Sequence, residues 1–133
     1  MQKRTAKGGI GPAKSKEIFD QLIALNREAF ERDRFSTAYH ALAAALHWAD
    51  EENDERQLAT VEKLAKEQLN WIDLHAPNYQ HSSQSAALRG HTNIYSNLER
   101  QARSAQLRIS SRRQFEQMLG TLPTAEFLEG DEG

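Results

Sequence analysis

Apolar side chains recur every three or four positions through most of residues 18–109, and no useful stretch alternates apolar and polar residues with a period of two. Spacings of three and four place side chains on one face of an α-helix, whereas a half-buried β-strand needs the period of two. β-Branched residues, which favour strands, are also few. The sequence therefore predicts an all-α protein without a sheet.

The periodic segments predict four helices. They cover about residues 15–33, 36–52 and 54–76, and a long fourth helix runs from Ser83 or Ser85 to about 109 or 119. Ser15, Ser36 and Asp54 are the expected N-caps, because their side-chain oxygens accept hydrogen bonds from the first free amides of a helix. Pro77 ends the third helix, since the residue before a proline avoids helical angles.

The apolar stripe of the long fourth helix changes phase after Ser110 and Ser111. We expect a kink, a separate short helix or fraying at this point. The short links at 33–35, 52–54 and 77–83 favour antiparallel neighbours. Two architectures fit these links, a four-helix antiparallel bundle and a stack of helical hairpins. The alanine-rich second helix is expected at the centre, because small side chains let neighbouring helices approach closely.

The two ends of the chain differ from its middle. Residues 1–13 contain glycines and a proline among basic residues, residues 120–133 contain them among acids, and neither has an apolar period. We expect a disordered basic tail, a single helical domain over 14–119 and a disordered acidic tail. No run of about 18 apolar residues predicts a membrane span. No export leader is recognised either, so we expect a cytoplasmic protein.

The net charge of -2 conceals blocks of opposite sign. Residues 17–73 are acidic, whereas residues 89–113 carry six arginines and a single acid. We predict that the arginines of the last helix form a partner-binding stripe, with these residues as candidates: Arg89, Arg100, Arg103, Arg108 and Arg112. Guanidinium groups bind carboxylates and phosphates, so an acidic protein surface is the favoured partner.

Two other interpretations of the arginines stay open. One is a solvated face that pairs with the acids of the first three helices, and the other is weak binding of nucleic acid. The slightly acidic net charge argues against a dedicated nucleic-acid binder. Aromatic residues are not interleaved with the arginines, so base stacking is not indicated. Self-association through the opposite charge blocks is also expected.

Histidines give a second candidate site. In an antiparallel arrangement, the end of the third helix, the start of the fourth and the start of the second meet at one end. His75, His81 and His91 would gather there, and neutral imidazoles are good transition-metal ligands. Trp71 and Tyr95 would wall a pocket beside them, and the start of the second helix would add Tyr39 and His40. No Glu-x-x-His or His-Glu-x-x-His motif supports the metal, so hydrogen-bonded histidines without a cofactor are the main interpretation.

Small and apolar side chains flank a turn in the first two helices, in this order: Leu22, Leu25, Ala29, then Asp33 and Phe35, then Ala38, Leu42 and Ala45. With this pattern the segment Leu25–Ala45 resembles one tetratricopeptide repeat. The turn glycine and the closing proline of that repeat are absent, and no second copy follows. The resemblance implies a scaffold that binds peptides or proteins without catalysis.

No motif for a catalytic nucleophile or a phosphate-binding loop is found. The chain has no cysteine, which excludes disulfides and thiol chemistry. The leading hypothesis is a small helical protein-interaction module without catalytic activity. The alternatives are a histidine-lined bundle that binds a metal or a small ligand, and weak nucleic-acid binding through the arginine-rich helix.

Overall fold

The computed structural model describes residues 11–120, and over this range the fold is all-α, as the sequence predicts. It contains five helices: α1 (Pro12–Glu31), α2 (Phe35–Glu51), α3 (Glu55–His75), α4 (Ser83–Leu88) and α5 (Ile94–Gly120). The expected tails lie outside the described residues except at their inner ends. Pro12 and Ala13 form the first turn of α1, and Gly120 is the last residue of α5.

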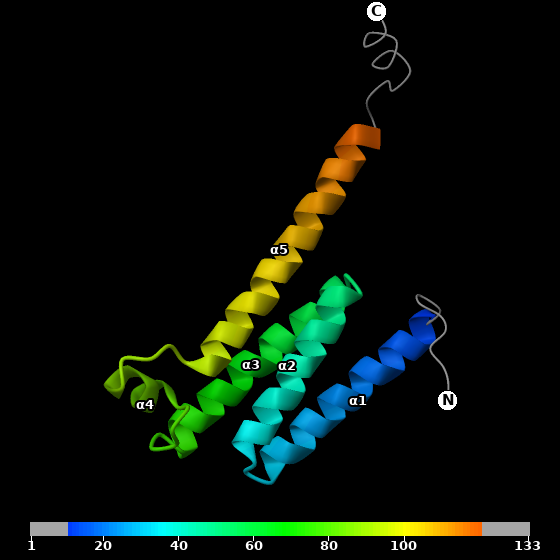
Figure 1. Cartoon of the computed structure of the whole chain (residues 1–133). Coiled ribbons are helices and arrows are strands. Elements are labelled where there is room, and N and C mark those ends of the chain that lie inside the picture. The colour runs from blue at the N-terminus through cyan, green and yellow to red at the C-terminus, as the bar shows by residue number, and fades with distance from the viewer. Residues whose placement is uncertain (1–10, 121–133) are drawn as a thin grey trace, which may run out of the picture.

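The four long helices form two antiparallel hairpins that lie side by side (Figure 1). Helix α1 packs along α2, α5 packs along α3, and α2 contacts both α3 and α5. Helix α2 therefore takes the central place that its alanines predict. Short α4 lies on the connection between α3 and α5 and packs against α3.

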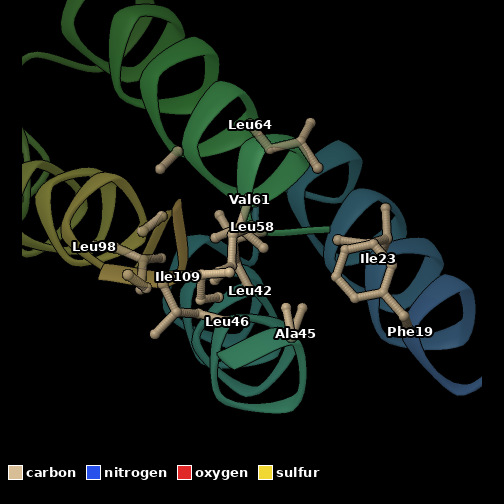
Figure 2. Packing of buried hydrophobic residues seen from close by; sticks show 14 residues of the cluster. Phe19, Ile23, Leu42, Ala45, Leu46, Leu58, Val61, Leu64, Leu98 and Ile109 are labelled. Atoms are coloured by element: carbon tan, nitrogen blue, oxygen red, sulfur yellow. The ribbon is translucent and has the colours of Figure 1, made fainter. Parts of the chain in front are cut away.

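The main hydrophobic core lies between the two hairpins and draws side chains from all four long helices (Figure 2). Phe19 and Ile23 come from α1 and meet Leu58 and Val61 of α3 in one cluster. Helix α2 contributes four buried alanines over its length: Ala38, Ala41, Ala45 and Ala49. These small side chains let α2 be enclosed on several sides without opening voids.

A second cluster closes the end of the molecule where α2 begins and α3 ends. Phe35, Leu69, Ile72 and Tyr95 are buried in it. The hydroxyl of Tyr95 donates a hydrogen bond of 3.0 Å to the backbone carbonyl of Phe35, so the one polar atom of this large buried side chain has a partner. This contact ties the start of α5 to the start of α2.

Three helix ends are closed by the same backbone motif. Asp33, Asn53 and Gly90 adopt left-handed backbone angles, with φ of 61°, 54° and 70°. In each case the amide of the following residue bonds to a carbonyl five positions earlier, as in Arg34 to Ala29 at 2.9 Å. This is the Schellman arrangement, which satisfies the free carbonyls at a helix end and turns the chain sharply.

Of the three predicted N-caps, one is confirmed and two are wrong. Asp54 caps α3, because its Oδ1 accepts a hydrogen bond of 3.0 Å from the amide of Gln57. Helix α1 begins earlier than expected, after Gly11, and Ser15 lies inside it. The hydroxyl and the carbonyl of Ser15 instead accept from Nε1 of Trp48 at 3.3 and 3.2 Å. Helix α2 starts at Phe35, so Ser36 is not its cap.

The expected fourth helix is two helices. Gly90 ends α4, and the side chain of Asn93 then caps α5 by accepting from the amides of Tyr95 and Ser96 at 2.8 and 3.1 Å. The kink expected after Ser110 and Ser111 is wrong, since α5 continues without a break to Gly120. Arginine, glutamine, glutamate and leucine surround the serines, and these are good helix formers.

Candidate partner-binding surface

Helix α5 is held against α3 by a stripe of five buried residues: Tyr95, Leu98, Ala102, Ala105 and Ile109. This stripe ends at Ile109, and every residue from 111 to 120 is exposed. In Figure 1 the end of α5 extends past the tips of α2 and α3. The arginines lie on the sides of this helix that the core does not use.

Two predicted partner-binding arginines are paired within the molecule. Arg103 donates to Glu62 of α3 at 3.1 Å and to Glu99 of α5 at 3.0 Å. Arg108 forms an ion pair with Asp50 at the end of α2. These two arginines therefore pair with acids of the same chain, which was one of the interpretations left open by the sequence.

Three predicted arginines make no ion pair with a carboxylate among residues 11–120. Arg100 donates to the Oδ1 atom of Asn97 at 3.0 Å. Arg89 follows α4 and donates to the backbone carbonyls of Ser85 and Gln80, so it lies apart from the α5 stripe. Arg112 is exposed on the projecting part of α5. The charges of these three guanidinium groups are therefore not neutralised by acids of the described chain.

A groove of about 420 Å³ runs between α2 and α5. Leu46 and Ala105 are its buried lining residues, and its polar lining consists of His47, Asp50, Asn97, Arg100, Gln101, Ser104 and Arg108. It therefore holds two of the predicted arginines, one of which is not paired with an acid. His47 enters the site from α2, which sequence reasoning did not connect with the arginines because the two helices are about fifty residues apart.

The α5 wall of this groove continues onto the projecting end of the helix. Positions three or four apart lie on one side of a helix, so Ser104, Arg108, Arg112, Phe115 and Leu119 form one line. Phe115 and Leu119 are 59% and 48% exposed, so two large apolar side chains of this line face the solvent. We call this line, together with Arg100 and Gln101, the α5 strip.

The predicted metal ligands are not gathered into one site. Among the residues that the structure describes, no group of three or more His, Asp or Glu side chains is placed to hold a metal ion. His75 stacks on Trp71 with a centroid distance of 4.4 Å, and its Nδ1 lies 3.0 Å from the carbonyl oxygen of Trp71. His81 and His91 line a separate hollow of about 290 Å³ beside Asn93.

Burial, followed by the positive charge of Arg89 and by His40, lowers the pKa of His81 below its ordinary value. The backbone carbonyl of His81 accepts from Nδ2 of Asn93 at 2.6 Å. The residue that caps α5 thereby also fixes the loop that carries this histidine. The lowered pKa favours the neutral imidazole, and the bond to Asn93 holds the backbone that carries it.

The predicted pocket residues belong to two separate sets of ring contacts. Trp71 meets Phe30 and Phe35 at centroid distances of 5.5 and 5.8 Å, and Tyr39 meets Tyr95 at 5.7 Å and His40 at 5.2 Å. Tyr95 is completely buried, so it lies inside this cluster instead of walling an open pocket. Trp71 is 39% exposed at its outer edge.

Sequence reasoning missed a larger groove, of about 640 Å³, between the first turns of α1 and α3. Its lining comes from both helices and the corner between α2 and α3: Ser15, Lys16, Phe19, Asp20, Glu52, Asp54, Arg56, Gln57 and Thr60. These residues form no sequence motif, and acidic residues near a helix start are common, so the sequence alone does not indicate a groove. They come together because α1 and α3 both pack against α2.

Comparison with known proteins finds no matching family, no similar curated protein and no similar solved structure. The resemblance of Leu25–Ala45 to a tetratricopeptide repeat therefore stays a prediction. Across the described residues, no helix is long and apolar enough to cross a membrane.

Proposed function

We propose that this chain is a protein-interaction module without catalytic activity, and that the α5 strip binds an acidic amphipathic helix of a partner protein. The observation that carries the proposal is the end of α5, which has no buried residue after Ile109 yet keeps Phe115 and Leu119 on the same side as the α2–α5 groove. A contiguous exposed apolar patch with a polar rim is typical of docking surfaces.

The chemistry of the strip suggests the kind of partner. Its first half lies in the groove and carries Arg100 and Arg108, while its second half carries Arg112 beside Phe115 and Leu119. An arginine fork binds a carboxylate through two hydrogen bonds, and apolar side chains of a second helix would cover Phe115 and Leu119. From Arg100 to Leu119 the strip is about 28 Å long, which matches a partner helix of about five turns.

The test is affinity purification of the full chain from its source cells with quantitative mass spectrometry. The Arg112→Glu/Phe115→Glu variant is expected to lose at least nine-tenths of an acidic partner. Lys66→Glu/Leu74→Glu is the matched control, because both of its positions are exposed on α3 away from the strip. Identical sets of co-purifying proteins for the wild type and the strip variant would contradict the proposal.

Self-association is tested separately by sedimentation equilibrium. If the partner helix belongs to a second copy, the molecular mass rises with concentration, and Phe115→Glu returns it to that of the monomer. A concentration-dependent mass that Phe115→Glu leaves unchanged would show that copies associate through another surface.

A further inference from the structure

We infer that the groove between α1 and α3 is a second binding site, and that it takes a lysine- or arginine-bearing peptide segment of a partner. It lies on a different face from the α5 strip and shares no residue with it. The inference therefore does not depend on the proposed function. Three features of the groove carry it: its shape, an unpaired buried amide and its charge.

The shape comes from how α1 and α3 meet. Asn26 and Gln68 bond directly to each other between the two helices. Toward the start of both helices, a volume of about 640 Å³ lies between Ser15–Asp20 of α1 and Arg56–Thr60 of α3. Phe19, one of its lining residues, is only 4% exposed and belongs to the main hydrophobic core. A groove of this volume is in the range of sites that hold a small ligand or a few residues of a peptide.

Gln57 supplies the unpaired amide. The residue is 8% exposed, and its Oε1 atom is buried without any hydrogen-bond partner. Buried amide oxygens nearly always have a partner, so each exception asks for an explanation. The Nε2 atom of the same amide is not among the buried atoms that lack a hydrogen-bond partner. A half-turn of the terminal amide exchanges the two atoms, so that Oε1 can accept from an N–H donor that enters the groove while Nε2 takes the buried place.

The charges around the groove select a cation. Lys16 and Asp20 pair with each other at 2.7 Å. At the corner between α2 and α3, Asp50 and Glu55 are paired with arginines of α5. Three further acids of this corner form no ion pair with a described residue: Glu51, Glu52 and Asp54. Arg56 is the one described lining cation without an ion pair, so the unpaired charges are negative in sum.

A peptide with lysine or arginine beside an apolar residue satisfies all three features. Its cationic side chains would face Glu52 and Asp54, its apolar side chain would pack on the apolar part of the groove wall, and an N–H group would donate to Gln57. An acidic peptide would meet uncompensated carboxylates, which disfavours it.

The experiment measures binding of a fluorescent Gly-Lys-Leu-Arg-Gly peptide to the full chain by anisotropy, with a Gly-Glu-Leu-Glu-Gly peptide for comparison. We expect binding of the basic peptide only, together with NMR shifts of the backbone amides of Ser15 and Phe19 and of the side-chain amide of Gln57. Gln57→Leu is expected to weaken binding at least tenfold without lowering the melting temperature, because it removes an unpaired buried oxygen. Glu52→Gln should weaken binding about threefold.

The matched controls are Gln114→Leu and Glu67→Gln, which change exposed positions outside the groove. The inference would be overturned if the wild type and Gln57→Leu bind the basic peptide equally and the affinity of the variants depends only on their net charge. The chain's own residues 1–10 also carry Lys3, Arg4 and Lys7. If replacing these three with glutamine raises the affinity for the peptide, the groove is filled by the chain itself, and the assignment to a partner is wrong.

Discussion

Asn26 and Gln68 face each other between α1 and α3, and each side-chain amide donates a hydrogen bond to the oxygen of the other, at 3.1 and 2.6 Å. Both residues are buried, and Nδ2 of Asn26 also donates to the carbonyl of Ala38 at 2.7 Å. One polar cluster thus joins α1, α2 and α3. It fixes which turns of these helices lie opposite each other, because a shift of either helix would leave amide groups unpaired.

Asn26→Leu is expected to lower the free energy of unfolding by about 2–4 kcal/mol, because it leaves the Gln68 amide buried without a partner and removes the side-chain donor to the Ala38 carbonyl. Gln68→Leu should cost less, since the bond from Asn26 to Ala38 survives. The double variant should cost less than the sum of the two single changes. Urea unfolding measures all three, with the exposed Asn70→Leu as control, and additive losses would contradict the coupling.

Tyr95→Phe is expected to lower the free energy of unfolding by about 1 kcal/mol at neutral pH, because the carbonyl of Phe35 loses its donor. Tyr39→Phe is the control, since the hydroxyl of Tyr39 makes no hydrogen bond to a described residue. An equal effect of the two changes would mean that the Tyr95 bond contributes nothing to stability.

The same residue gives an alkaline pH dependence. Burial, then Tyr79 and Tyr39, raise the pKa of the Tyr95 hydroxyl well above its ordinary value of 10.0. Above pH 10 the unfolded chain therefore loses this proton while the folded chain keeps it, and the free energy of unfolding falls as the pH rises. Tyr95→Phe should reduce this alkaline loss, which unfolding at pH 9 and pH 11 measures.

Asn53 carries the left-handed backbone of the turn between α2 and α3. Asn53→Gly is expected to leave the melting temperature unchanged or to raise it, because glycine adopts this conformation without strain. Asn53→Val should cost about 1–2 kcal/mol, since a β-branched residue is strained there. Thermal unfolding compares the two, and valine tolerated as well as glycine would mean that the turn does not need the left-handed angle.

His81 predicts an acid pH dependence. Its pKa is lowered by burial and then by Arg89 and His40, so the unfolded chain binds its proton first as the pH falls through the ordinary histidine range. The free energy of unfolding should therefore fall between pH 7.5 and pH 5.5. His81→Gln should reduce the fall, and Arg89→Gln should reduce it less. An unchanged pH profile in His81→Gln would contradict the prediction.

The positions of the helices could be predicted from the sequence, because the buried face of each helix needs apolar residues three or four positions apart. Leu58, Val61 and Leu64 are spaced for one face, and all three are buried. The break at Gly90 was missed because the apolar stripe resumes on its far side at Ile94 and Tyr95. The local signals for that break were Gly90, since glycine often ends a helix, and Asn93, since asparagine often caps the start of the next one.

The candidate surfaces were predicted less completely, because ion pairs depend on which helices become neighbours. The sequence shows six arginines in one segment but not which of them are paired with acids. Arg108 differs from Arg100 because it pairs with Asp50, which lies 58 positions before it. The groove beside Gln57 was invisible for the same reason. A glutamine near a helix start has no pattern that distinguishes a buried amide from a solvated one.

The projecting end of α5 converts small motions of the core into large ones. Beyond Ile109 this helix has no further buried residue, so the packing of the preceding four turns and the ion pair between Arg113 and Glu55 determine its direction. The arm from Ile109 to Gly120 is about 17 Å long, and a tilt of about 10° at its base would therefore displace its tip by about 3 Å. Substitutions at Leu98 or Ala102 would thereby re-aim Phe115 and Leu119 without touching them.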